Sequence, residues 1–482
     1  MSATFDFERP LRNPDTGSQQ LMTKRARWLV LWGFVLPGSA QVLAGNRKLG
    51  RFALGATIVL LVAAGMTVLG VATAREFTLS VLLNPIVLTI VQVLIVAYAA
   101  LWVLLGFDTL RLARIIKTKP NWRLPIAALS IVLTIVPVLG AAWAANTFST
   151  FRGAVGDIFT NQAPSVPPID GRYNILLLGA DRGEDREGLR PDSISLVSVD
   201  AETGQSVIIG LPRELMEMPF PETSPMHEVH PNGFCVAPNA FSEEYGGCLT
   251  NGRLNELYTE VEDAYDPNYS YLYEGIYADA VSRGSSPGIE ATKDAVEGAT
   301  GLQVQFYVLI DMAGFAQLID ALGGVTVDVK EPIPVGGRED EYTGEWVDIA
   351  WYIEPGVQTL NGENALWFAR ARHGFANGDY DRMERQRDLQ AAILAQMNPQ
   401  TVLLRMQELT KAGGDLIVTD IPESMLGSFV NLASKSREFE PVRVALTPPD
   451  IDPEYPDYTL AHEMVVAGVV AASPPKEETA GN

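Results

Sequence analysis

The sequence is poor in the residues that most often hold transition metals, with four histidines and two cysteines among 482 residues. Cys235 and Cys248 have neither the spacing nor the companion ligands of a zinc site. His227 and His230 are spaced H-x-x-H, but they stand in an irregular acidic stretch. In an oxidising compartment the two cysteines are expected to pair, which would contribute about 2–3 kcal/mol. The alternative is two free thiols.

Three common catalytic signatures are missing as well. The chain has no GxxxxGK[ST] phosphate loop, no GxSxG nucleophile elbow and no HExxH motif. Their absence argues against P-loop nucleotide hydrolases, elbow-type serine hydrolases and zinc proteases. Phosphoryl chemistry in this chain would have to rest on other residues.

Basic residues are scarce and unevenly placed. The chain has 36 Lys and Arg against 58 Asp and Glu, a net charge of −22. Residues 1–150 hold 14 basic and 5 acidic residues, a balance of +9, and the remainder has a balance of −31. The large acidic part lacks the broad basic surface that nucleic-acid binding needs, so nucleic acid is excluded as its partner.

Residues 24–146 have the composition of a membrane region, after a polar N-terminus that we expect to be disordered and cytoplasmic (1–23). A short apolar run, Trp28 to Leu43, is broken by Pro37-Gly38-Ser39. Longer runs follow, each near the ~20 residues that cross a bilayer, at about 52–74, 81–106 and 124–146.

Basic residues predict the orientation of these runs, because cytoplasmic loops are enriched in Lys and Arg. They cluster before the first run, at 46–51 and at 111–123. Both ends of the first run therefore belong on the cytoplasmic side, which predicts a re-entrant or interfacial segment, three full spans and an extracytoplasmic remainder. Four spans with an outside N-terminus is the competing interpretation. A cleaved signal peptide after Ala40 fits less well, because further hydrophobic runs follow.

The rest of the chain predicts a linker (147–171), a layered α/β domain (172–471) and a disordered tail (472–482). Residues 215–250 are expected to be an irregular insertion, and no internal repeat is evident. Strands are expected near 173–179, 193–199, 206–211, 303–310 and 325–329, and helices near 288–298, 312–322, 362–369, 381–397 and 401–411.

Arginine and aspartate recur together in short motifs of this acidic domain. Asp181 follows the first predicted strand, and Arg190-Pro-Asp192 enters the second. Carboxylates at a strand end and a neighbouring strand start can converge on one hard cation, although aspartate also caps turns. Arginine offers a permanent charge and a planar fork of donors that fits phosphate oxygens.

A second arginine, Arg213, follows the third predicted strand and precedes Glu214. Taken alone, such a residue is usually a solvated charge or an ion-pair partner. Asn255 stands in Gly252-Arg-Leu-Asn-Glu-Leu-Tyr258, where it is either a polar site contact or a helix cap. Gly323-Gly324 fits a helix C-cap that turns into a strand.

Arg370 and Arg372 follow the predicted helix 362–369. If the chain is extended there, the two side chains point to the same side, where an anion between them would relieve their repulsion. The alternative is that both are surface arginines of an acidic domain.

Periodicity points Arg382 and Gln386 inward. Positions 382, 386, 389 and 393 form one helical stripe, and Leu389 and Ile393 make its later part apolar. An unpaired arginine facing the interior is costly, so a bound anion at the helix start would explain this position.

These motifs, in this order, resemble the LytR-CpsA-Psr family of cell-wall glycopolymer transferases over about 172–398. The resemblance implies an α/β/α sandwich that binds a polyprenyl diphosphate in a hydrophobic pocket. It implies transfer of a phospho-linked glycan from that lipid to peptidoglycan, at a membrane. It also implies that Asp181 and Asp192 hold magnesium or manganese. The diphosphate is expected to bind Arg190, Arg213, Arg370, Arg372, Arg382 and Gln386.

The sequence departs from the family pattern on the acceptor side. Glu214 stands where the family has aspartate, and Arg253 where it has lysine. A tyrosine-rich stretch at 265–277 replaces the glycine pair that commonly follows the asparagine matching Asn255. Two rival functions remain: a polyprenyl-diphosphate hydrolase, and a lipid-binding sensor or transcription attenuator. The polar N-terminal part is short for a helix-turn-helix domain, which disfavours the attenuator.

Overall fold

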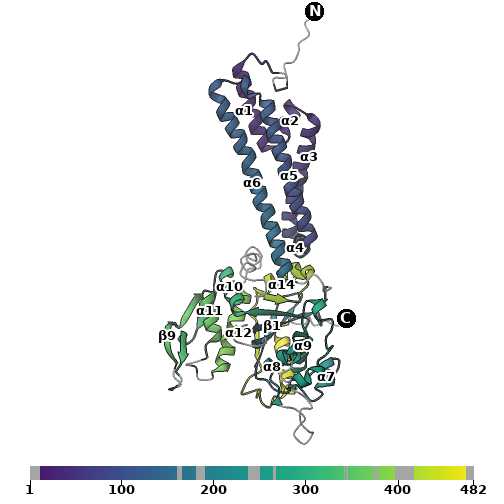
Figure 1. Cartoon of the computed structure of the whole chain (residues 1–482), viewed down its shortest axis with the longest axis vertical. Coiled ribbons are helices and arrows are strands. Elements are labelled where there is room, and N and C mark those ends of the chain that lie inside the picture. The colour runs from purple at the N-terminus through teal and green to yellow at the C-terminus, as the bar shows by residue number, and fades with distance from the viewer. Residues whose placement is uncertain are drawn as a thin grey trace, which may run out of the picture. The chain divides into compact units, whose positions relative to one another are not determined.

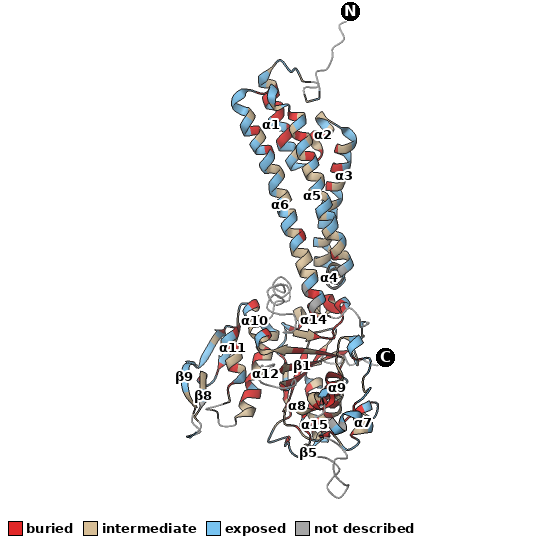
Figure 2. Cartoon of the chain, in the orientation of Figure 1, coloured by how far each residue is buried: buried red, intermediate tan, exposed pale blue. Residues whose placement is uncertain are grey.

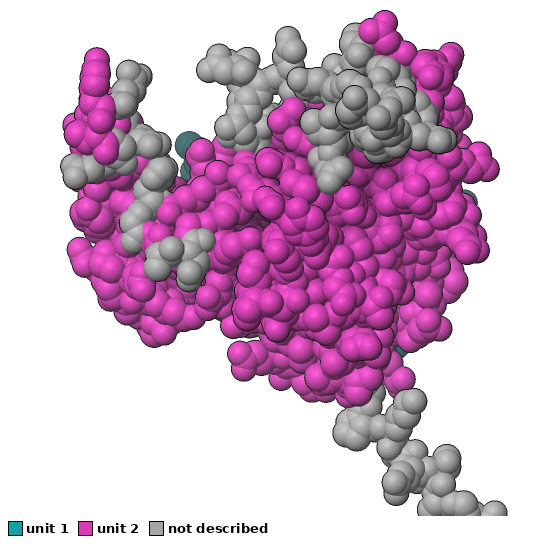
Figure 3. Space-filling model, turned by 90° about the horizontal axis from the view of Figure 1, so that it is seen from below, with its two compact units in different colours: residues 1–152 teal, residues 153–482 magenta. Residues whose placement is uncertain are grey.

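The computed structural model describes residues 11–12, 14–159, 165–180, 190–236, 250–263, 267–340, 342–343, 346–372, 375, 378–396 and 417–473. It divides into two compact units, residues 1–152 and 153–482 (Figure 3). The division falls within the predicted linker.

The first unit is helical (Figure 1). Its helices are α1 (Gln19–Val35), α2 (Ser39–Ala44), α3 (Arg47–Thr73), α4 (Arg75–Leu83), α5 (Pro85–Ala113), η1 (Ile115–Lys117) and α6 (Pro120–Ile158). Among the described residues, three helices are long and apolar enough to cross a membrane: Arg47–Thr73, Ile86–Lys117 and Pro120–Gly153. That number matches the three predicted spans, whereas the sidedness of the helices stays a prediction.

Several predicted boundaries in this unit were wrong. Residues 19–23 belong to α1, because Ser18 caps that helix by accepting from the Leu21 backbone N–H. The predicted run 81–106 starts inside α4 and is interrupted at Asn84, which caps α5 ahead of Pro85. The first part of the predicted linker is helical, because α6 continues to Ile158.

The first apolar run folds into α1 and α2 on either side of a break at 36–38. Gly38 makes the turn with a φ of 97°, where a Cβ would lie 2.6 Å from the carbonyl oxygen of Gly50. The Gln41 side-chain amide donates to the carbonyl of Leu105 on α5 at 3.1 Å. The run is therefore a helical hairpin packed on α5, and its re-entrant character stays a prediction.

The second unit is built on a six-stranded mixed sheet in the order β11-β6-β1-β2-β3-β12. β1 pairs parallel with β6 and antiparallel with β2, and β3 pairs antiparallel with β2 and parallel with β12. The strands are β1 (Arg172–Ala180), β2 (Pro191–Asp200), β3 (Ser206–Leu211), β6 (Phe306–Asp311), β11 (Ile417–Thr419) and β12 (Val442–Ala445).

Both faces of the sheet are covered, as Figure 2 shows by the buried residues along it. Alternate residues of β1 to β3 pack on one face against α8 (Leu254–Asp263), α9 (Pro287–Thr300) and α15 (Tyr458–Ala471). The other residues of these strands pack against α12 (Asp379–Gln396) and α14 (Leu426–Ser436). This is the expected α/β/α sandwich, because both faces of the strands are apolar.

A smaller core lies beside the sandwich and shares α12 with it. It is formed by α10 (Met312–Leu322), α11 (Gly362–Arg370), a β7–β10 pair (Val325–Val329, Gly356–Leu360) and a β8–β9 hairpin (Ile333–Glu339, Trp346–Ile353). Gly323 caps α10 with a φ of 88°, as its sequence context indicates. The hairpin was not predicted.

The insertion at 215–250 contains short elements where it is described: α7 (Pro225–Val229), β4 (Cys235–Val236) and β5 (Thr250–Asn251). Cys235 is disulfide-bonded, whereas Cys248 and the predicted helix 401–411 lie outside the described residues. The buried ring of His230 lies 3.2 Å from the hydroxyl of Tyr273, so this histidine belongs to an aromatic core. The remaining described elements are 3-10 turns: η3 (Pro267–Leu272), η4 (Val281–Arg283) and η5 (Glu423–Met425).

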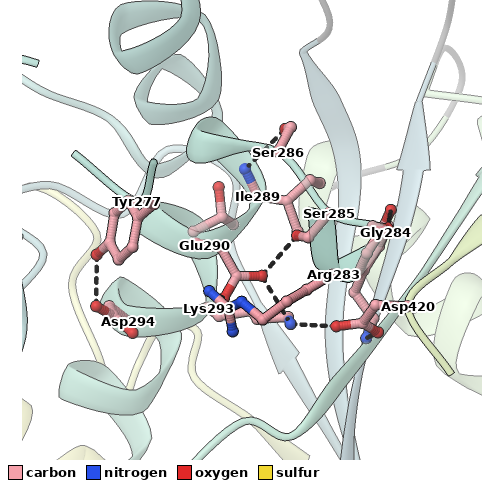
Figure 4. Close-up of polar contacts among 12 residues, drawn as sticks. Tyr277, Arg283, Gly284, Ser285, Ser286, Ile289, Glu290, Lys293, Asp294 and Asp420 are labelled. Carbon is pink, nitrogen blue, oxygen red and sulfur yellow. Dashed lines mark hydrogen bonds and ion pairs between the residues drawn. The ribbon is translucent and has the colours of Figure 1, made fainter. Parts of the chain in front are cut away.

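A buried ionic cluster fastens α9 to the far edge of the sheet (Figure 4). The Lys293 ammonium contacts Glu290 at 2.9 Å and also contacts Asp420. Asp420 in turn accepts from the Tyr307 backbone N–H at 2.8 Å. Burial raises the pKa of Asp420, and the Lys293 charge opposes that shift. Each charge has a partner, as buried ions require.

Candidate functional site

The site forms at one edge of the sheet, where several strands end together. Ala180, the last residue of β1, is paired with Asp311 at the end of β6 and with Pro191 at the start of β2. Ile194 of β2 pairs with Leu211, the last residue of β3. Asp192 lies two residues before Ile194, and Arg213 lies two residues after Leu211. Because the two strands are antiparallel, the sheet register itself brings Asp192 and Arg213 face to face.

Arg213 and Asp192 form the central ion pair of this edge. Nη1 of Arg213 donates to Oδ1 of Asp192 at 2.5 Å, and Nη2 lies 3.5 Å from Glu214 Oε1. Burial acts to lower the pKa of Arg213, but the bond to Asp192 and the nearby carboxylates raise it overall. Glu214 stands where the family has aspartate, and its longer side chain still reaches the arginine.

Helix α12 contributes a second arginine from the neighbouring layer. The Gln390 side-chain amide donates to the Ser195 hydroxyl at 3.2 Å, which anchors the helix on β2. Two turns earlier, Nη2 of Arg382 donates to the Asp192 backbone carbonyl at 3.2 Å and to Asp379 Oδ2 at 3.0 Å. The predicted inward stripe is confirmed, since Arg382 is 2% exposed and Leu389 lies in the core.

A third arginine, Arg372, joins the same carboxylates. Its Nη2 lies 3.8 Å from Asp192 Oδ1, and its Nε lies 3.3 Å from Asp379 Oδ1. Asp379 was not singled out from the sequence. Its spacing of three residues from Arg382 on a helix is the pattern that could have shown it.

Arg370 is the last residue of helix α11. Helix α11 continues through Arg370, so the extended conformation on which the common direction of Arg370 and Arg372 depended is not present at Arg370. Arg370 is exposed, and its guanidinium lies 5.9 Å from the ring centroid of Trp367.

Two consecutive residues of α12 hold the end of α11. Arg385 donates from Nε to the Phe368 carbonyl at 3.0 Å, and it also donates to the Ala371 carbonyl. The Gln386 amide donates to the Ala369 carbonyl at 3.1 Å. The last carbonyls of a helix have no partner within it. Arg385 and Gln386 satisfy three carbonyls here and thereby fix the segment that carries Arg370 and Arg372.

Asn255 lies next to Arg213. Its backbone N–H donates to the Arg213 carbonyl at 3.1 Å, and its buried side-chain oxygen has no hydrogen-bond partner among the described residues. Asn255 is therefore at the site, one residue into α8. Arg190 directly precedes β2 and is exposed, whereas Asp181 lies outside the described residues.

Unpartnered donors indicate what the site accepts. The buried Nε atoms of Arg213 and Arg382 have no hydrogen-bond partner within the described part of the chain. Leaving a buried N–H group of a charged side chain without a hydrogen-bond partner is energetically costly. Burial lowers the pKa of Arg382 to about 10, with Asp379 opposing and Arg372 and Arg213 reinforcing the shift. The residue is therefore still cationic at neutral pH, and these donors fit an anion.

Among the described residues, the fit to a divalent cation rests on Asp192. Within the described ranges, no cluster of three or more His, Cys, Asp or Glu could hold a metal ion. Asp192 offers hard carboxylate oxygens with a side chain 28% exposed, of which Oδ1 is engaged by arginine. Its chemistry suits magnesium, and its expected companion ligand Asp181 is not described.

The fold and the site define a layered α/β domain with an arginine-rich anion site at a sheet edge. The LytR_cpsA_psr family model matches residues 157–451, more than half of the chain. The chain therefore belongs to the LytR_cpsA_psr family.

Curated relatives match over part of their length. Biofilm regulatory protein A of Streptococcus mutans is 25% identical over 57% of this chain and 57% of its own. A polyisoprenyl-teichoic acid–peptidoglycan teichoic acid transferase TagU of Halalkalibacterium halodurans is 31% identical over 52% of this chain and 61% of its own. The crystal structure of TagV from Bacillus subtilis has 19% identity and a TM-score of 0.40, covering 63% of this chain and 98% of that one. The chain thus spans about half the length of the curated relatives it matches.

Proposed function

We propose that this protein transfers a glycopolymer from a polyprenyl-diphosphate carrier onto peptidoglycan and leaves a phosphodiester link. The observation that carries the proposal is the convergence of Arg213, Arg372 and Arg382 with two unpartnered guanidinium N–H groups. Family membership supports it, because a relative with 31% identity is named as a teichoic acid transferase acting between a polyisoprenyl carrier and peptidoglycan.

In the proposed reaction the three arginines bind and neutralise the diphosphate. Their fixed positions favour the charge that develops on the phosphoryl oxygens, and a hydroxyl of the acceptor sugar attacks the glycan-side phosphorus. The polyprenyl phosphate leaves with the bond electrons. Arginine stays protonated and cannot act as the base. Asp192 and Glu214 are the described carboxylates that could take the hydroxyl proton.

Magnesium dependence is part of the proposal. Asp192, together with Asp181, would hold the cation, which supplies further neutralisation of the diphosphate. Asp192 Oδ1 cannot serve Arg213 and a cation equally well. We therefore expect Asp192→Asn to weaken the effect of magnesium on lipid-diphosphate binding while leaving the fold intact.

We also propose that the protein is a multi-pass membrane protein whose residues from about 147 lie outside the cytoplasm. The three candidate spans and the basic clusters at 46–51 and 111–123 support this arrangement. Cysteine-accessibility labelling of Lys117→Cys and Arg338→Cys in intact cells would test it. If the cysteine at position 117 is labelled and the one at position 338 is not, the orientation in the membrane is opposite to the proposed one.

The decisive experiment uses the full-length protein in detergent with a short lipid-diphosphate glycan, magnesium and peptidoglycan fragments. A glycan–phosphate–peptidoglycan adduct detected by mass spectrometry, and lost in Arg213→Ala and Arg372→Ala, supports transfer. Release of phospho-glycan into water without an adduct would identify a hydrolase instead. Tight lipid binding without either product would identify a binding protein and overturn the proposal.

A further inference from the structure

A cavity of about 350 Å³ lies within the 215–236 insertion and the segment before α15. Its walls include the rings of Phe220 and Tyr458 and the pyrrolidine of Pro231, together with the polar residues Glu217, His227 and Asn232. The volume is within the range of small-ligand sites. Nothing in the proposed diphosphate chemistry uses this cavity.

The cavity is joined to the candidate site by one short stretch of chain. Glu217 follows Arg213 by four residues, so their Cα atoms lie no more than about 14 Å apart. The intervening backbone is held on both sides. Met216 N donates to the Pro453 carbonyl at 3.0 Å, and the Tyr458 hydroxyl donates to the Met216 carbonyl at 2.6 Å. The anion site and the cavity are therefore two ends of one supported segment.

The cavity wall is rigid where the segment turns. Glu217 has a φ of 51° and Gly233 has a φ of 102°, both in the left-handed region. A Cβ at Gly233 would lie 2.5 Å from the Glu217 carbonyl oxygen, so only glycine fits there. Phe234 N donates to the Met218 carbonyl at 2.9 Å, next to the disulfide-bonded Cys235. The cavity is thus formed before any ligand binds.

Charge separates the two ends of this segment. The Arg213 end carries three arginines and two unpartnered Nε donors, whereas the residues that line the cavity include one carboxylate, Glu217, and no lysine or arginine. Burial and then the Glu217 charge raise the pKa of Tyr458. The diphosphate-linked glycan is anionic, so it is attracted to the Arg213 end of the segment and repelled from the Glu217 end. The cavity therefore suits a neutral ligand.

We propose that this cavity is an acceptor subsite that binds a neutral sugar residue of the peptidoglycan glycan strand. The inference rests on the proposed function. Ring and proline faces pack on the C–H face of a sugar, and His227 and Asn232 offer hydrogen bonds to its hydroxyls and amide. Because the acceptor is a polymer, one sugar can occupy the cavity while a neighbour presents its hydroxyl at the diphosphate.

The test compares full-length wild-type protein with a His227→Ala/Asn232→Ala double variant, and uses a peptide-free peptidoglycan tetrasaccharide as acceptor. Asn232 is exposed and His227 is half-buried, and no hydrogen bond of either side chain is among those that hold the described part of the insertion, so the fold should persist. We expect the acceptor KM to rise about tenfold, as for loss of one or two hydrogen bonds, with the Kd for lipid diphosphate unchanged. Glu222→Ala, an exposed change in the same insertion, is the control and should leave KM unaltered.

The possible outcomes separate this inference from the proposed function. If wild-type protein forms no adduct with any peptidoglycan fragment, the proposed function fails. If wild-type protein transfers glycan but the double variant keeps the wild-type acceptor KM, the cavity is not an acceptor subsite. If only peptide-bearing fragments saturate the wild-type protein, the peptide rather than the sugar is recognised, and the proposal is overturned.

Discussion

Replacing Arg213 separates the two roles that the structure gives this residue. In Arg213→Ala, Asp192 loses a hydrogen bond of 2.5 Å but keeps Arg372 at 3.8 Å. The Arg213 and Asp192 side chains are 20% and 28% exposed, so water compensates part of the loss. We therefore expect the free energy of unfolding to fall by only about 1–2 kcal/mol.

The expected effect on catalysis is much larger. In the proposed reaction, Arg213 contributes a permanent charge and its unpartnered Nε donor to the phosphate on which charge develops. Losing one such preorganised donor typically lowers kcat by about 10²–10³. Arg213→Lys restores the charge without the planar fork, so it should recover only a small part of that loss.

The assay measures adduct formation by mass spectrometry over a range of lipid-diphosphate concentrations, alongside chemical unfolding in the same detergent. Arg338→Ala is the matched control, because it removes a 2.9 Å ion pair with Asp348 in which both side chains are about two-thirds exposed. That change should cost well under about 1 kcal/mol and leave kcat intact. An Arg213→Ala variant that keeps more than about a tenth of the wild-type kcat would refute the assignment of Arg213 to the reacting phosphate.

Three further changes test the supporting structure. Lys293→Met leaves Asp420 buried without a cation, whereas Glu290 keeps its ion pair with Arg283 at 3.3 Å, so unfolding should become about 3–5 kcal/mol easier at neutral pH. The loss should shrink as pH falls and the raised pKa of Asp420 is crossed, and a pH-independent loss in chemical unfolding would contradict this. Arg385→Met removes the donors that hold the end of α11. It should lower kcat about tenfold or more with a smaller change in lipid Kd, whereas an unchanged kcat would show that the segment positions itself. Burial lowers the pKa of His230 from 6.5 to about 4. Stability from this group is therefore present above pH 6.5 and lost as pH falls toward 4, by up to about 3 kcal/mol. Unfolding of His230→Asn should be correspondingly less acid-sensitive, and equal acid sensitivity would rule the histidine out.

The sequence was sufficient for elements with a clear hydrophobic pattern. Strand Ser206–Leu211 and helix Met312–Leu322 occur at their predicted bounds, because the first is a continuous apolar run and the second an amphipathic stripe. The inward position of Arg382 also follows from the helical spacing of residues 382, 386, 389 and 393 alone. The β8–β9 hairpin escaped prediction because its exposed strand residues mix aromatic, glycine and charged side chains and show no regular alternation.

Asp192, Arg213, Arg372 and Arg382 were singled out from the sequence, but Asp379 and the pairings among these residues were not. Asp192 and Arg213 are far from Arg382 in sequence, and only the sheet register and the anchoring of α12 on Ser195 bring them together. Local sequence could not show that α11 continues to Arg370, whose exposed guanidinium lies over the Trp367 ring. It also could not show that Gln386 bonds to a backbone carbonyl, because that partner lies on another helix.

The ligand-free site is close to charge balance, and this explains how an acidic domain keeps arginines together. Arg213, Arg372 and Arg382 are each paired with Asp192, Asp379 or Glu214. These carboxylates offset the repulsion among the guanidinium groups, but they also compete with an incoming anion for the same donors. A diphosphate therefore binds well only where it replaces these bonds and also reaches the two unpartnered Nε groups. A divalent cation bound to Asp192 would weaken the ion pair between Asp192 and Arg213, so Arg213 could bind the diphosphate more readily. Binding of the cation and of the diphosphate should then reinforce each other, since each removes a cost that the other would otherwise meet.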